Sequence, residues 1–233
     1  PEDSARQPFP AAFTEIALAE AGFTRRDDHG EAIFRLKGLS AAFEMGTITF
    51  ITGGNGSGKT TMLRLLTGLL PLEEGAVMID GEPAAEEAMQ AYRDRISAIF
   101  SDHHLSRRIY GLSDAKLAIV SEWLKRLKMN KKVQISDGAF SSVDLSTGQR
   151  KRLALAVALA EDRPILVLDE WAADQDPEFR KEFYENILPS IKKPNRIVFC
   201  VTHDDHWFHL ADRRYQLKEV KIALITQRPE LLG

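Results

Sequence analysis

The chain has 233 residues, of which 44% are hydrophobic and 28% charged, and its formal net charge is −3. This length and composition predict one α/β domain, or one large and one small lobe, with a buried core. Acids and bases nearly balance, so no strongly basic field favours a nucleic-acid partner, and no apolar stretch approaches the roughly 20 residues that span a bilayer. The single cysteine, Cys200, has no partner for an internal disulfide and lies in the apolar run RIVFCV, which indicates a buried, reduced thiol.

Short apolar runs bounded by turn residues predict strands along the whole chain. The predicted strands are 14–20, 31–44, 47–53, 76–80, 96–100, 164–169, 196–202, 213–219 and 221–226. The first two are separated by a polar turn at 24–31 and are expected to form an antiparallel edge. Most of the later strands alternate with helical segments, which predicts a mostly parallel sheet in an α/β fold.

Helical periodicity occupies the segments between these strands. The predicted helices are 58–70, 102–132, 147–161 and 177–188. Pro71 is expected to end the first helix. The second helical segment carries one apolar stripe, made of Leu117, Val120, Trp123, Leu124 and Leu127. The residues between strands 96–100 and 164–169 therefore predict an inserted helical subdomain of about 102–160.

The sequence GGNGSGKT, residues 53–60, matches the motif G-x-x-x-x-G-K-[ST] at every fixed position. It follows a predicted strand and opens a predicted helix. Glycines let the backbone approach an anion closely, and the N–H groups of a helix N-terminus point at it. The expected phosphate-binding residues are Gly53, Gly54, Asn55, Gly56, Ser57, Gly58, Lys59, Thr60 and Thr61. A glycine-rich turn beside an accidental lysine is the simpler alternative, but the flanking elements favour a nucleoside triphosphate site.

Two adjacent carboxylates follow the apolar run RPILVL. In nucleotide sites of this kind a second strand ends in an aspartate that holds Mg²⁺, and Asp169 fits that position. Glu170 comes next and is expected to polarise an attacking water. Lys59 would place a positive charge between the β- and γ-phosphates, and the Thr60 hydroxyl would ligate the metal. A solvated acidic loop at a strand end is the alternative interpretation of these charges.

The stretch LSTGQRKR, residues 145–152, resembles the LSGGQ signature of ABC ATPases, with Thr147 in place of the first glycine. It lies between the phosphate loop and LVLDE, as in that family, and the resemblance covers roughly residues 12–218. The resemblance implies the P-loop ABC-ATPase fold, a mostly parallel sheet core with an antiparallel β edge and an inserted helical subdomain. It also implies that Ser146 and Gly148, with Gln149 beside them, contact a nucleotide held by a second copy of the chain.

Further ABC elements are assigned by the same resemblance. In AADQDP, Asp176 takes the D-loop aspartate position, which implies communication across the dimer, and His203 in VTHDD matches the switch histidine. Ser101 stands where the family usually has the Q-loop glutamine, and it is expected to bond a Mg²⁺-bound water. Arg25 stands where an aromatic residue usually stacks on adenine. Either Arg25 or Phe23 is expected near the base, although core packing is the favoured role for Phe23.

The stretches SDHHL, LDEWAADQDP and THDDHWF resemble ABC exporters of cyclic peptides and siderophores, typified by pyoverdine, syringomycin and microcin exporters. That group implies a half-transporter, in which 1–12 are a linker from a fused membrane domain and 13–233 are the ATP-binding domain. The implied function is hydrolysis of ATP with Mg²⁺, catalysed by Glu170, His203 and Lys59, to power peptide export at the cytoplasmic face of the inner membrane. The expected partners are the membrane domain and a head-to-tail second copy, without nucleic acid. The alternative is a soluble ABC-type ATPase that is not coupled to transport.

Two other features have competing interpretations. His203, His206 and His209 are spaced like zinc ligands on a helix, but His203 already has a role, so this interpretation is disfavoured. The basic stretch RLKMNKK resembles a nucleic-acid patch, although a solvated helix end is favoured. Asp174 is assigned no chemistry and is expected to be a solvated loop residue.

Overall fold

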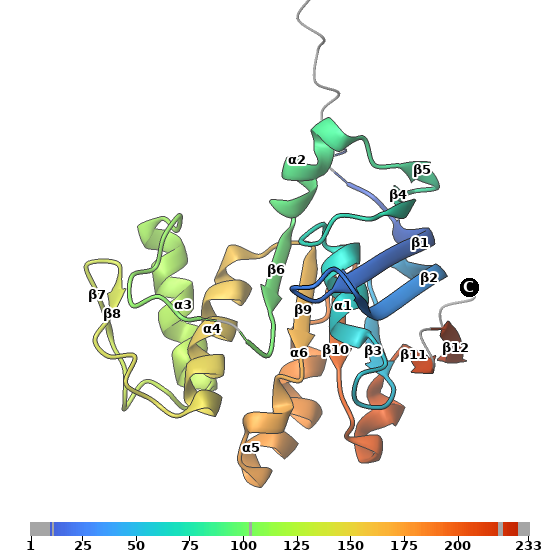
Figure 1. Ribbon diagram of the computed structural model, residues 1–233. Coiled ribbons are helices and arrows are strands. Elements are labelled where there is room, and N and C mark those ends of the chain that lie inside the picture. The colour runs from blue at the N-terminus through green and yellow to red at the C-terminus, as the bar shows by residue number, and fades with distance from the viewer. Residues whose placement is uncertain (1–9, 11, 103, 219–220, 228–233) are drawn as a thin grey trace, which may run out of the picture.

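The computed structural model describes residues 10, 12–102, 104–218 and 221–227, which form two sheets with helices packed against them (Figure 1). The strands of the larger sheet are β3 (Ile48–Thr52), β6 (Ile96–Ile99), β9 (Ile165–Asp169), β10 (Ile197–Val201), β11 (Arg213–Lys218) and β12 (Lys221–Gln227). Those of the smaller sheet are β1 (Glu15–Arg26), β2 (Ala32–Glu44), β4 (Glu74–Ile79) and β5 (Glu82–Pro83). A hairpin of β7 (Ile135–Ser136) and β8 (Ala139–Phe140) stands apart from both sheets.

The helices are α1 (Lys59–Leu66), α2 (Met89–Arg93), α3 (Asp114–Arg126), α4 (Thr147–Glu161), α5 (Pro177–Glu182) and α6 (Leu188–Ser190). One π turn, η3 (Phe183–Ile187), joins the last two of them. Three short 3₁₀ turns complete the set, namely η1 (Glu86–Ala88), η2 (Ala172–Asp174) and η4 (Asp205–Leu210). Figure 1 shows α3 and the β7–β8 hairpin on one side of the molecule, with α4 between them and the larger sheet.

The larger sheet has the strand order β12-β11-β3-β10-β9-β6, and its neighbours are parallel except at β12. Every residue of β3, β9 and β10 is buried, because helices or the smaller sheet cover both faces. The predicted mixed α/β fold, with a mostly parallel sheet and an antiparallel sheet, is confirmed. The carboxyl ends of β3, β9 and β10 meet at one edge, which is where ligands bind in open parallel sheets.

Alternate residues of the central strands point into two separate cores. In β9, Leu166 and Leu168 pack with α4, α5 and η3, whereas Ile165 and Val167 pack with α1 and the smaller sheet. This period-two division is the ordinary consequence of strand geometry. Cys200 lies on the α4 side and is buried and unbridged, as predicted, and burial raises the pKa of its thiol to about 12.

Several element boundaries differ from the predicted ones. The strand expected to end at Glu20 continues to Arg26, so part of the predicted polar turn is paired with β2. Helix α1 ends at Leu66 rather than at Pro71, because Gly68 takes a left-handed φ of 67° just beyond its C-cap.

The predicted helix over 102–132 is also too long. Its regular part is α3 alone, which begins after Ser113, whose hydroxyl accepts a hydrogen bond from the Lys116 amide. The apolar stripe of that helix does face the core, with Val120 and Leu124 buried. Among the described residues, no helix is long and apolar enough to cross a membrane.

The end of α1 depends on one buried phenol. The hydroxyl of Tyr92 in α2 donates a 2.7 Å hydrogen bond to the carbonyl of Leu66, one of the last carbonyls of α1, and Tyr92 is fully buried. Replacing Tyr92 by Phe should lower the free energy of unfolding by about 1–2 kcal/mol, because that carbonyl loses its donor. Urea unfolding monitored by circular dichroism measures the change.

The matched control is Tyr110→Phe, since the Tyr110 side chain is 72% exposed and its removed hydroxyl is hydrated in either state. Equal stabilities for the two variants would contradict the assigned role of Tyr92.

Candidate active site

The phosphate loop lies between the buried end of β3 and the start of α1. Gly53 has a φ of 141°, and a Cβ built there would lie 2.3 Å from the carbonyl oxygen of Leu217, so only glycine fits. Gly58 has a φ of 98° and directly precedes α1, which turns the first N–H groups of that helix toward the loop. The sequence therefore places glycine where the loop must pass a neighbouring strand and where the helix must begin.

The side-chain amine of Lys59 bonds to the backbone of the phosphate loop. Its Nζ donates two hydrogen bonds of 2.9 Å, to the carbonyl oxygens of Gly53 and Gly54. Burial lowers the pKa of Lys59, while the neighbouring carboxylates of Glu170 and Asp169 act to raise it. This amine is a positive charge held against two carbonyls of the loop, where it can attract an oxyanion.

A cavity of about 430 Å³ opens above this loop. Its lining residues are Arg25, Phe34, Asn55, Gly56, Gly58, Lys59, Thr60, Thr61 and Glu170. Phe34, which the sequence did not single out, pairs with Arg25 across β1 and β2 and is half-buried. Phe23 packs against the core of the smaller sheet and is not among the lining residues. Phe34 was missed because the aromatic residue was sought on β1, whereas the neighbouring strand supplies it.

Asp169 ends β9 beside the phosphate loop and is fully buried. Its Oδ2 accepts hydrogen bonds from the hydroxyls of Thr60, at 2.9 Å, and Ser101, at 3.4 Å. Its Oδ1 is buried without a hydrogen-bond partner. Burial raises the pKa of Asp169, and the Thr60 hydrogen bond opposes that rise. An unpartnered carboxylate oxygen beside two hydroxyls fits a hard cation that takes oxygen ligands.

Glu170 follows in a left-handed conformation, with a φ of 49° that is uncommon for any residue except glycine. Its Oε1 lies 3.3 Å from Nε2 of His203, and the two side chains are 39% and 45% exposed. Its backbone N–H donates to the Val201 carbonyl, 3.2 Å away at the end of β10. Thus the structure brings together Lys59, Asp169, Glu170 and His203, which the sequence separates by as much as 144 positions, from 59 to 203.

The signature residues lie at the start of α4. Ser146 caps the helix, because its hydroxyl accepts from the Gln149 amide and the Gln149 side chain accepts from the Ser146 amide. Gly148 is buried, and a Cβ there would lie 2.2 Å from the carbonyl oxygen of Asp174. None of these signature residues is among those that line the cavity above the phosphate loop.

The loop after β9, residues 170–176, contacts α4 through charged side chains, and the sequence did not single out the α4 partners Lys151 and Arg152. Asp174 was expected to be merely solvated, but its Oδ2 lies 2.6 Å from Nζ of Lys151. Asp176 caps α5, accepting a hydrogen bond from the Phe179 amide, and pairs with Arg152 at 2.7 Å. Ion pairs between a helix and a distant loop have no periodic signature, so sequence patterns did not reveal them.

The predicted zinc alternative is not supported by the geometry. Within the part of the chain that the structure describes, no group of three or more His, Cys, Asp or Glu side chains is placed to hold a metal. The zinc interpretation of His203, His206 and His209 is therefore wrong for these residues, because they lie around a loose 3₁₀ turn and His209 Nδ1 contacts the His206 carbonyl instead.

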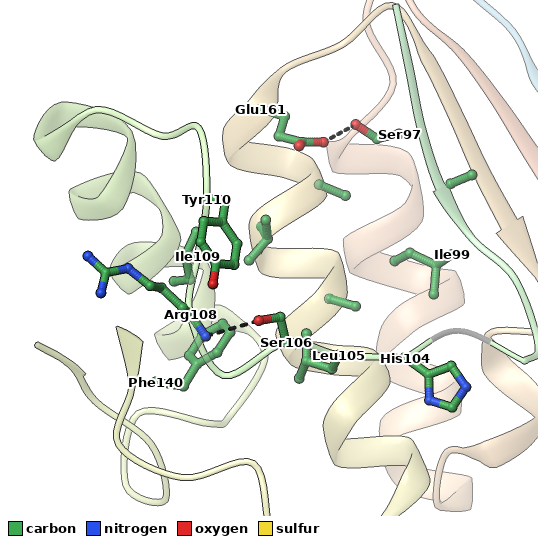
Figure 2. Close-up of a pocket in the computed structure, with 14 residues that line it drawn as sticks. Ser97, Ile99, His104, Leu105, Ser106, Arg108, Ile109, Tyr110, Phe140 and Glu161 are labelled. Atoms are coloured by element: carbon green, nitrogen blue, oxygen red, sulfur yellow. Dashed lines mark hydrogen bonds between the residues drawn. The ribbon is translucent and has the colours of Figure 1, made fainter. Parts of the chain in front are cut away.

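A second cavity, of about 240 Å³, lies between β6, α4 and the segment 104–110 (Figure 2). The segment with Leu105, Ile109 and Tyr110 forms one wall, and α4 and β6 form the others. Ser97 of β6 donates to the Glu161 carboxylate at one end. This mainly apolar hollow shares no lining residue with the cavity above the phosphate loop.

The buried charge of Asp169 has a measurable consequence. A carboxylate whose folded pKa is raised destabilises the fold above that pKa, and the penalty disappears below the unfolded value of 3.8. Asp169→Asn should therefore raise the nucleotide-free free energy of unfolding at pH 7, and this advantage should shrink as the pH falls. Urea unfolding at several pH values measures it.

Asp102→Asn is the opposite-sign control, because the Arg64 hydrogen bond lowers the pKa of Asp102 and loss of that carboxylate removes a favourable contact. A nucleotide-free Asp169→Asn protein less stable than wild type at pH 7 would contradict the assigned burial penalty.

Comparison with known proteins identifies relatives of this chain. A family model described as ABC transporter matches residues 36–173. The ATP-binding protein SyrD of Pseudomonas syringae pv. syringae is 38% identical over 208 residues, covering 88% of this chain but only 37% of SyrD. The energy-coupling factor transporter ATP-binding protein EcfA1 of Oenococcus oeni is 34% identical over 192 residues, covering 78% of this chain and 69% of that protein.

Two solved structures share the fold. A bacterial Atm1-family ABC exporter with ATP bound superposes with a TM-score of 0.78 at 22% identity, covering 97% of this chain and 41% of that one. The cbiO1 protein of Clostridium perfringens, part of the ABC transporter complex cbiONQ, gives a TM-score of 0.70 at 24% identity, covering 94% and 91%. With the family match and the relatives above, the chain belongs to the ABC transporter family and is an ATP-binding domain of the ATPase type.

Proposed function

We propose that this chain hydrolyses ATP at the carboxyl ends of β3, β9 and β10, with Glu170 acting on the attacking water. The observation that carries the proposal is the 3.3 Å contact between Glu170 and His203, because Glu170 also lines the cavity that contains Lys59. Glu170 aligns or deprotonates the water for in-line attack on the γ-phosphate. Lys59 and His203 stabilise the negative charge that develops in the transition state.

Thr60, Ser101 and Asp169 are the residues that would hold Mg²⁺. Support comes from the unpartnered Oδ1 of Asp169 and from the two hydroxyls that approach its Oδ2. When bound, Mg²⁺ neutralises charge on the β- and γ-phosphates. Asp169 then keeps its charge in a buried site, because a cation supplies the interaction that burial otherwise withholds.

Phe34 and Arg25 form the proposed contact surface for the base of ATP. Both line the phosphate cavity and they are paired across β1 and β2. A phenyl ring and a guanidinium both offer planar faces on which a base stacks. Phe23 contributes indirectly, because it lies on the same strand as Arg25 and packs against the core of the smaller sheet.

A second copy of the chain, arranged head to tail, completes each nucleotide site in this proposal. The N-terminus of α4 carries Ser146, Gly148 and Gln149, and these do not line the phosphate cavity of their own chain. A 15-residue helix offers a positive dipole end and a cap suited to phosphate. The γ-phosphate of one site would therefore bond to the signature of the other, and hydrolysis would release that contact.

The membrane domain of the transporter is the second proposed partner. The chain spans 37% of SyrD and 41% of the Atm1-family exporter chain, so most of each of those proteins lies outside the matched region. The cavity walled by Leu105, Ile109 and Tyr110 is suited to an apolar segment of that domain, and Tyr110 is 72% exposed (Figure 2). This domain would then act at the cytoplasmic face of the inner membrane.

The proposed cargo is a cyclic peptide or a siderophore-like peptide, exported from the cell. It rests on the exporter-like stretches of the sequence and on the similarity to SyrD. The similarity to EcfA1 favours a second candidate, an ATP-binding subunit of an energy-coupling factor transporter. The higher identity and wider coverage of this chain by SyrD favour the exporter.

Replacement of Glu170 by Gln should preserve ATP binding and lower the turnover number by roughly 100-fold or more, because the water loses its base. The variant should also accumulate an ATP-dependent dimer, since ATP persists between the two copies. Phosphate release measures turnover, and gel filtration with and without ATP·Mg²⁺ measures the dimer.

Glu178→Gln is the matched control, because Glu178 forms only a surface ion pair with Lys128 at the start of α5. Wild-type turnover in Glu170→Gln would contradict the proposed role of Glu170 in acting on the attacking water.

The exporter proposal has its own test, independent of catalysis. The gene that encodes this chain should specify about six membrane-spanning helices ahead of Pro1, each of roughly 20 apolar residues. Sequencing the upstream region and fractionating the full protein with membranes measure this. An upstream region without such segments would contradict the fused half-transporter and leave the ATPase assignment intact.

A further inference from the structure

Lys151 is a buried lysine that contacts the loop 170–176. It lies in the first half of α4, and its side chain is 1% exposed. Its Nζ donates a 2.9 Å hydrogen bond to the carbonyl oxygen of Glu170 and lies 2.6 Å from Oδ2 of Asp174. The amine therefore joins both ends of a five-residue segment to the signature helix.

The contact acts on a residue whose backbone has a left-handed conformation. Glu170 has a φ of 49°, and for a residue with a side chain this conformation persists only where surrounding contacts hold it. The Lys151 amine fixes the carbonyl side of that residue, and the Val201 carbonyl accepts from its N–H on the other side. These two bonds determine the direction in which the Glu170 side chain leaves the backbone.

The backbone of Lys151 takes part as well. The indole N–H of Trp171, the residue after Glu170, donates a 3.0 Å hydrogen bond to the Lys151 carbonyl, and Trp171 is buried. Lys151 thus accepts from one loop residue through its backbone and donates to others through its side chain. A displacement of α4 at this point moves Glu170 and Trp171 together.

About one helical turn before Lys151, close packing also holds α4 against the loop 170–176. The Gly148 backbone approaches the Asp174 carbonyl closely enough that no Cβ fits between them. The side-chain amide of Gln175 donates a 3.1 Å hydrogen bond to the Gly148 carbonyl. The signature end of α4 and the loop therefore form one packed unit, with Lys151 as its charged centre.

A purely structural ion pair is the simpler interpretation. Buried ion pairs often contribute little net stability, because the charges lose their hydration. Asp174 retains 43% exposure of its side chain, so it does not need Lys151 in order to stay hydrated. The amine also donates to the Glu170 carbonyl, so its two contacts connect α4 to the residue that carries the carboxylate as well as to Asp174.

We propose that Lys151 is a positioning residue: its amine holds the backbone of Glu170 so that the carboxylate faces His203 and the attacking water, and it links that carboxylate to the signature end of α4. The inference rests on the proposed role of Glu170. In a head-to-tail dimer, a signature helix that docks on one nucleotide would orient the carboxylate that acts on the other.

The test compares Lys151→Met with Lys116→Met. The second variant is matched, because Lys116 also donates a 2.9 Å hydrogen bond to a backbone carbonyl of α4, that of Glu161 at its far end. Lys151→Met should lower kcat roughly 10- to 100-fold through misplacement of the carboxylate, with the Kd for ATP changed less than about twofold. Lys116→Met should leave kcat at the wild-type level.

Hydrogen exchange on the nucleotide-free chain gives a readout that does not depend on turnover. The amides of Ala173 and Gln175 donate within the loop, to the carbonyls of Glu170 and Ala172. Their exchange should accelerate in Lys151→Met and remain unchanged in Lys116→Met. Asp174→Asn, which keeps the amine-to-carbonyl bond, should retain more turnover than Lys151→Met, and an exposed change of this kind does not threaten folding.

The outcomes separate the two proposals. Loss of turnover in Glu170→Gln with wild-type kcat in Lys151→Met overturns the inference about Lys151 alone. Similar fold losses of kcat and ATP affinity in Lys151→Met, together with a lower thermal stability, also overturn it, because they indicate a general structural role. Wild-type turnover in Glu170→Gln refutes the proposed function instead.

Discussion

The hydrogen bond from Thr60 to Asp169 joins the two elements on which the rest of the site depends. It connects the first turn of α1 to the end of β9, and it leaves the other oxygen of a fully buried carboxylate without a partner. The fold tolerates this cost because positive groups surround the carboxylate, with Lys59 on the phosphate loop and Lys151 on α4. Burial of one negative charge thus makes this point favourable for a cation.

Two cationic side chains, those of Lys151 and Arg180, hold the loop 170–176 in place beside Asp169. Lys151 holds its start, and Arg180 of α5 donates to the carbonyls of Ala172, Ala173 and Gln175 while it approaches Asp204 at 3.6 Å. Asp204 directly follows His203. The loop that carries Glu170 is therefore connected both to α4 and to the segment that contains His203 and Asp204, by donors that its own backbone carbonyls require.

Local motifs allowed much of the fold and site to be predicted. Glycine spacing and a following helix marked the phosphate loop, and an apolar strand marked Asp169, because each depends on residues close together in sequence. Phe34 and the partner of Asp174 were not predictable in this way, since β1–β2 pairing and packing of α4 bring together residues 9 and 23 positions apart. The bulges in β1 also broke the alternation of apolar residues on which its predicted end relied.

The one departure within the signature follows from the same packing. Thr147 is the first residue of α4 and is exposed, and its hydroxyl accepts a hydrogen bond from Arg150, so nothing in this chain requires glycine there. Gly148 is different, because the carbonyl of Asp174 occupies the space that a Cβ would need. The first glycine of the pair is free to vary within the chain, whereas the second is held by the loop 170–176. A signature that reads LSTGQ therefore retains the glycine on which the joint between α4 and Glu170 depends.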